Sequence, residues 1–105
     1  MSGTRQHLPN RRASEQFAFA CNGLNYAASA SFFADGRLAE IFLNNAKAGS
    51  DSDTAAKDSA VVASIALQYG VPLDVIRHAL LRDPRGVASS PLGVALDLIA
   101  TGAAA

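Results

Sequence analysis

Apolar and polar residues alternate with a period of two over much of residues 14–45, and this pattern predicts β-strands. Phe17, Phe19 and Cys21 share one face of the first run, which ends at Asn22-Gly23. Asn and Gly both tolerate positive φ, so this dipeptide is typical of a tight hairpin turn. A second run follows, with one face formed by Leu24, Tyr26, Ala28, Ala30 and Phe32. The first two strands are therefore expected to pair antiparallel.

A third alternating run occupies residues 37–44, after a second turn at Asp35-Gly36. Both of its faces carry apolar residues, because Phe42 lies on one face and Ile41 and Leu43 lie on the other. We expect the second face to be covered in part, either by helices or by another chain. Since the helices that follow are short for covering a whole sheet, the protein is expected to form a homo-oligomer.

From Asp53 onward the apolar spacing becomes helical, and Gly70 is expected to end this helix. Its predicted buried stripe consists of Ala55, Val62, Ile65, Ala66 and Tyr69. Pro72 and Pro91 suit the first turns of a second and a third helix. The predicted fold class is therefore α+β: a three-stranded antiparallel meander followed by three helices packed on one face, which is a two-layer sandwich.

The chain has 105 residues, half of them apolar, which suits one domain with a modest core. Nine basic and nine acidic residues cancel, so nucleic acid is not an expected partner. Arg5, His7, Arg11 and Arg12 precede the first strand. We expect residues 1–13 to form a flexible basic arm and residues 14–105 to form a single domain. No apolar run approaches the roughly 20 residues that span a bilayer, and a cytoplasmic location is expected.

Few residues suggest chemistry. Cys21 is the only cysteine, which excludes an internal disulfide and a cysteine-rich zinc site, and we interpret it as a small core residue. His78 is interpreted as a solvent-facing helix residue. Asp51 and Asp53 lack the glycine-spaced loop of a calcium site and are explained by helix capping. The sequence thus predicts no catalytic residue, no metal site, no cofactor and no independent enzyme activity.

The join between the third strand and the first helix contains Lys47, Gly49 and Ser50. Gly49 permits a sharp turn, Ser50 can accept a hydrogen bond from a free amide of the first helical turn, and Lys47 adds a cation. Such a helix start can hold a phosphate or carboxylate, and it can equally be an ordinary cap. The nearby Asp51 and Asp53 favour the cap, because they would repel a bound anion.

Three segments resemble the TSCPD domain family, over about residues 15–100. They read GLNYAASASFFADGRLAEIFLNNAKAGSDSD, AVVASIALQYGVPLDVIRHALL and SSPLGVALDLI. Members of this family occur at the C-terminus of adenosylcobalamin-dependent ribonucleotide reductases and as short separate proteins. The resemblance implies a non-catalytic accessory or interaction module whose protein partner is a ribonucleotide reductase or a second copy of the chain. The alternative function is a small anion- or nucleotide-binding module that uses Lys47, Gly49 and Ser50.

The chain departs from the family at its naming motif. Where the family has Thr-Ser-Cys-Pro-Asp, this chain has Ala88, Ser89, Ser90, Pro91 and Leu92. Ser89, Ser90 and Pro91 are thus the family-motif positions here, and the motif cysteine is missing. A role that depends on that cysteine is not expected in this chain. Nor can a chain of this size and cysteine content hold the barrel, paired cysteines and cofactor pocket of a reductase.

Overall fold

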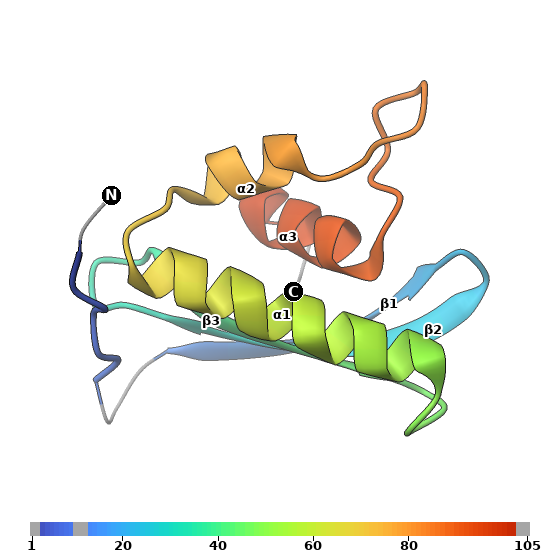
Figure 1. Ribbon diagram of the computed structural model, residues 1–105, viewed down its shortest axis with the longest axis horizontal. Coiled ribbons are helices and arrows are strands. Elements are labelled where there is room, and N and C mark those ends of the chain that lie inside the picture. Colours follow the sequence, from blue (N-terminus) through green and yellow to red (C-terminus); the bar gives the residue numbers. More distant parts are fainter. Residues whose placement is uncertain (1–2, 10–12, 103–105) are drawn as a thin grey trace.

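A computed structural model describes residues 3–9 and 13–102 of the chain and shows a sheet followed by a helical layer (Figure 1). The strands are β1 (Ser14–Cys21), β2 (Leu24–Phe32) and β3 (Leu38–Asn45), and the helices are α1 (Asp51–Gln68), α2 (Leu73–Ala79) and α3 (Pro91–Thr101). The strands form an antiparallel sheet in the order β1-β2-β3, and the helices lie on one face of it. The predicted α+β meander with helices on one face is confirmed.

The strands are connected by the two predicted turns. Asn22 and Gly23 have φ angles of 52° and 77°, and Cys21 pairs with Leu24 across this two-residue hairpin. The second turn contains Gly36, with φ of 91°, and is closed by hydrogen bonds between Phe33 and residues 36 and 37. The turn residues account for the two chain reversals, and the pairing of β2 with β3 also contains an irregularity between Ser31 and Phe32.

The core lies between the sheet and the helices. Tyr26, Ala28, Ala30, Ile41 and Leu43 contribute the sheet side of it. The helical side is formed mainly by α1 and α3, through Ala56, Ala60, Ala63, Leu67, Leu92, Ala95 and Leu96. The predicted inward face of β1 is confirmed, although Phe17 and Phe19 are only partly buried.

The predicted buried stripe of the first helix is wrong. Val62 is 68% exposed and Ile65 is 39% exposed, and Ala55 is exposed as well. The inward face instead carries the small residues Ala56, Ala60, Ala63 and Ser64, interspersed with Leu67 and two polar residues. Small side chains allow the helix to approach the sheet closely. The inward face is therefore set by side-chain volume and hydrogen bonding rather than by hydrophobicity.

The outer edge of β3 is closed by side chains of α1. The Ser64 hydroxyl accepts a hydrogen bond from the Ile41 N–H (2.9 Å) and donates one to the Ile41 carbonyl (3.0 Å). The Gln68 amide donates to the Ala39 carbonyl (3.0 Å). At the far end, the Asp53 carboxylate accepts from the Asn45 N–H (2.9 Å). These three polar side chains make part of the hydrogen bonds that a fourth strand would make.

The segment before the sheet contacts the end of α1. The Gln6 N–H donates to the Gln68 carbonyl (2.7 Å), and the Arg5 guanidinium donates to the Gln68 side-chain oxygen. Arg37 also donates to the Gln6 side chain (3.1 Å). Of the basic residues predicted to form the arm, Arg11 and Arg12 lie outside the described residues. A flexible arm over residues 1–13 stays a prediction.

No helix in the described ranges combines the length and apolar character needed to cross a membrane.

Candidate functional site

The start of α1 contains the three predicted ligand residues. Ser50 is the N-cap: its hydroxyl accepts from the Asp53 N–H (3.1 Å) and donates to the Lys47 carbonyl (2.8 Å). Gly49 has φ of 75°, a left-handed conformation in which other residues are strained. Lys47 donates its backbone N–H to the Asn45 side chain (2.8 Å). Lys47, Gly49 and Ser50 therefore form one tight turn that caps the helix.

Asp53 is the residue at this turn whose role the sequence did not reveal. Its carboxylate accepts from the Lys57 ammonium (2.8 Å), the Asn45 N–H (2.9 Å) and the Gly49 N–H (2.9 Å), and its side chain is 2% exposed. The hydrogen bond from Lys57, followed by those from the two backbone amides, lowers the pKa of Asp53 to about 2. An internal carboxylate thus already uses the Gly49 amide that an external anion would need.

The family-motif positions lie at the start of α3. Ser90 is its N-cap, with a hydroxyl that accepts from the Gly93 N–H (3.2 Å), and Pro91 occupies the first turn. A Cβ on Gly93 would lie 2.9 Å from the Ala88 Cβ, so glycine permits the close approach of the preceding loop. The serine and proline thus serve as a cap and a helix start.

The β1–β2 hairpin meets these motif positions. The Asn22 side-chain amide donates to the Ser89 carbonyl (3.1 Å), and the Cys21 sulfur lies 4.0 Å from the same oxygen. Burial raises the pKa of the Cys21 thiol, which keeps it protonated at neutral pH and poorly reactive. The thiol therefore behaves as the predicted core residue. Its position beside the motif was missed, because residues 21 and 89 are distant in sequence.

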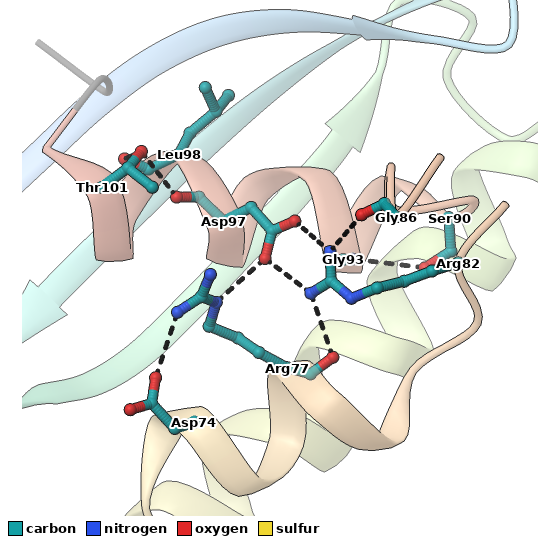
Figure 2. A network of polar contacts seen from close by, with 9 residues as sticks. All are labelled: Asp74, Arg77, Arg82, Gly86, Ser90, Gly93, Asp97, Leu98 and Thr101. Carbon is teal, nitrogen blue, oxygen red and sulfur yellow. Dashed lines mark hydrogen bonds and ion pairs between the residues drawn. The ribbon is translucent and has the colours of Figure 1, made fainter. Parts of the chain in front are cut away.

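A cluster of ionic contacts joins α2, the following loop and α3 (Figure 2). Asp97 accepts two hydrogen bonds from Arg82 (2.6 and 2.8 Å) and one from Arg77 (2.9 Å). Arg77 also pairs with Asp74 (3.0 Å), and Arg82 donates to the Arg77 and Gly86 carbonyls. Hydrogen bonding from Arg82 and then from Arg77 lowers the pKa of Asp97 to about 2. Because each charged group is paired, the cluster fixes α2 against α3.

The described residues hold no constellation suited to catalysis. His78 is exposed on α2, as predicted, and no group of three or more His, Cys, Asp or Glu side chains within the described part of the chain is placed to bind a metal. The charged groups that gather, at Asp53 and at Asp97, are each satisfied by neighbouring donors. Such groups stabilise the fold and are poorly suited to proton transfer.

An apolar groove of about 510 Å³ lies between α1 and α2. It is lined by Asp58, Ser59, Val62, Ala63, Ala66, Val75, Ile76, Ala79, Leu80 and Leu92, and we call it the α1–α2 groove. Val62 and Val75 are 68% and 57% exposed on its two sides. A second hollow of about 470 Å³ shares Ser59, Leu80 and Leu92 with it and reaches the family-motif residues Ser90 and Pro91. An apolar surface of this form is suited to contact with another protein.

Comparisons with known proteins point to one class of enzyme. The chain is 38% identical over 72 residues to a vitamin B12-dependent ribonucleotide reductase of Rhodopirellula baltica and 35% identical over 74 residues to that of Agrobacterium fabrum. That of Bradyrhizobium diazoefficiens is 34% identical over 70 residues. These matches cover 67–70% of this chain but only 6–7% of the reductases. No protein-family model matches the chain, and no solved structure matches it significantly. The chain is therefore similar to a short segment of these reductases.

Proposed function

We propose that this protein is a non-catalytic accessory module of the TSCPD type that acts by binding a B12-dependent ribonucleotide reductase. The observation that carries the proposal is the similarity itself: 34–38% identity to segments that make up only 6–7% of the reductases. A segment of that length has the size of one small domain within a large enzyme. A chain that carries the same module can bind where the reductase's own segment binds.

The α1–α2 groove is the surface we assign to this contact. Its valines, Val62 and Val75, are the most exposed of the large apolar side chains on the described helices. Residues that remain apolar and exposed on two neighbouring helices are suited to bury against a partner, where most of the binding energy comes from a few central side chains. The charged side chains at Asp97 are occupied within the chain and contribute little to a new interface.

Binding to a purified B12-dependent ribonucleotide reductase tests the proposal. We expect the parent protein to bind, and Val62→Asp and Val75→Asp each to weaken binding by about tenfold or more, because each places a charge in an apolar contact. Val61→Asp is the matched control: Val61 is 49% exposed on the same helix but does not line the groove. Loss of binding in the control alone, or no binding by the parent, contradicts the proposal.

The absence of independent activity is tested separately. The purified protein is incubated with adenosylcobalamin, a dithiol and each ribonucleotide, with a complete reductase as positive control. We expect no deoxyribonucleotide product from the protein alone. Product formed by the protein and abolished by Cys21→Ser would contradict a non-catalytic role. The cytoplasmic location stays a prediction, which fractionation of the native cell would test.

A further inference from the structure

The outer edge of β1 carries backbone groups without a partner in the described part of the chain. In an antiparallel ladder, alternate residues direct both backbone groups to the same neighbour. The Phe32 N–H donates to the Ala13 carbonyl, and Phe17 pairs with Ala28, so the odd-numbered residues of β1 bond to β2. The N–H and C=O groups of Ser14, Gln16, Ala18 and Ala20 therefore point away from the sheet. Such an edge is a template for another strand.

The aromatic side chains of β1 are also incompletely covered. Phe17 and Phe19 lie on the helical side of the sheet, 6.0 Å apart between ring centroids, and both are only half-buried. Phe19 stacks on Tyr26 at 5.5 Å, which leaves the side away from β2 open. Helix α1 packs mainly on β3, and α3 also contacts β1. Apolar surface and free backbone groups therefore occur together at this edge.

From this edge we infer that two copies of the chain pair through β1 in antiparallel orientation, with the two-fold axis at Ala18. The result is one continuous sheet of six strands, three from each copy. In this register Ala18 lies opposite the second copy's Ala18, and Phe17 lies opposite its Phe19. Opposed residues of an antiparallel pair lie on the same face, so both helical layers cover the same side.

The sequence of β1 is self-complementary in this register. The outward-pointing residues 16, 18 and 20 form the hydrogen-bonded pairs, and Phe17 and Phe19 fall in the closer pairs without hydrogen bonds, where side chains interact best. Two Phe17–Phe19 pairs form, one on each side of the axis. Glu15, the only charged residue of β1, lies opposite the second copy's Cys21, so no like charges meet. On the outer face Gln16 and Ala20 make a pair without steric conflict.

The opposite edge of the sheet explains why such an assembly stops at two copies. Ser64 already hydrogen-bonds both backbone groups of Ile41 on β3, Gln68 bonds the Ala39 carbonyl, and Asp53 bonds the Asn45 N–H. A chain with one open and one closed edge forms a two-fold dimer, whereas two open edges would allow an extended fibre. This inference is independent of the reductase-binding proposal, which concerns the α1–α2 groove.

Sedimentation of the full chain at micromolar concentration tests the dimer. We expect the parent to sediment as a dimer and Ala18→Lys to weaken dimerisation by about fivefold or more, because two ammonium groups would face each other at the axis. Ala27→Lys is the matched control. Ala27 is exposed and pairs with Ala18, but it lies on the central strand β2, away from the edge. Dimerisation of this variant should match the parent.

A cross-link tests the register in a second way. Ala18→Cys places two thiols in a hydrogen-bonded pair whose Cα atoms are about 5.5 Å apart, a spacing that permits a disulfide. Under mild oxidation we expect a covalent dimer from Ala18→Cys and none from Ala27→Cys. A monomeric parent overturns the inference. It is equally overturned if Ala18→Lys leaves the dimer unchanged, or if the two cysteine variants cross-link equally.

Discussion

The two edges of the sheet differ in what satisfies their backbone. At β3, the buried Ser64, Gln68 and Asp53 of α1 hydrogen-bond four outward backbone groups: both groups of Ile41, the Ala39 carbonyl and the Asn45 N–H. At β1, the side chains of the described residues leave the outward backbone groups to solvent or to another strand. Three polar residues of the longest described helix thus cover the β3 edge, and none covers the β1 edge. Because of this difference, a further strand can pair with the sheet at β1 but not at β3.

Acid should destabilise the protein through two paired carboxylates, Asp53 at the β3 edge and Asp97 between α2 and α3. Asp53 and Asp97 have pKa values of about 2 in the folded protein, below the ordinary value of 3.8, so the folded state binds these protons less tightly than the unfolded chain does. The stability they contribute is present above about pH 5 and is lost as the pH falls toward 2. We expect the melting temperature at pH 2 to be lower than at pH 7 by on the order of 15 °C. A melting temperature that is flat over this range contradicts the assignment.

Replacing Asp53 isolates its part of that effect. Asp53→Ala leaves the Asn45 and Gly49 amides without their acceptor, and we expect the melting temperature to fall by about 10 °C at neutral pH. Asp51→Ala is the matched control, because Asp51 lies in the same helical turn but is exposed. Thermal unfolding followed by circular dichroism measures both. If the melting temperature fell equally in both variants, the negative charge at the helix start alone would explain the stability that Asp53 contributes.

Removing the hydrogen bonds at the middle of the β3 edge is expected to reduce stability less. Ser64→Ala removes both hydrogen bonds to Ile41, and we expect it to reduce the free energy of unfolding by about 2 kcal/mol. Ser59→Ala on the same helix removes only a local bond to the Ala56 carbonyl and should be nearly neutral. Urea denaturation at neutral pH compares them. If both variants unfold at the same urea concentration, the hydrogen bonds from Ser64 to the edge strand do not stabilise the fold.

Substitutions in the turn that leads from β3 into α1 test whether this turn is only a helix cap or also binds an anion. Ser50→Ala should cost about 1 kcal/mol, because it leaves the Asp53 N–H unpaired, whereas Lys47→Ala should be nearly neutral. Neither phosphate nor a nucleotide should raise the melting temperature, since Asp53 holds the Gly49 amide. The anion-binding alternative gains support if phosphate stabilises the parent in a concentration-dependent way and Lys47→Ala abolishes that stabilisation.

Removal of residues 1–12 should have the smallest effect. The preceding segment contacts the closed edge through Arg5 and Gln6, which hydrogen-bond Gln68, but it adds no residue to the core cluster. We expect the truncated protein to unfold cooperatively, with a melting temperature within about 4 °C of the parent. Differential scanning calorimetry measures both properties. Loss of cooperative unfolding would place the start of the domain before Ser14.

Local sequence determined the order of the elements and, to within about two residues, where β3 and α1 begin. The hairpin at Asn22-Gly23, the turn at Gly36, the end of α1 near Gly70 and the start of α3 at Pro91 follow from residue types that few other conformations suit. Period-two alternation also identified the inward face of β1 and β2. These features depend on neighbours within a few residues, and so they can be read from the chain alone.

The tertiary structure alone decided which side of α1 faces the sheet and what its polar residues do there. Hydrophobic spacing favoured Val62 and Ile65 as buried, but the inward face is built from alanines together with Ser64, Gln68 and Asp53. Their partners on β3 lie 8 to 29 residues away, and the Asn22–Ser89 contact spans 67. Spacing along one helix cannot reveal that a strand edge nearby needs hydrogen bonds, because that need arises only when the two elements pack together.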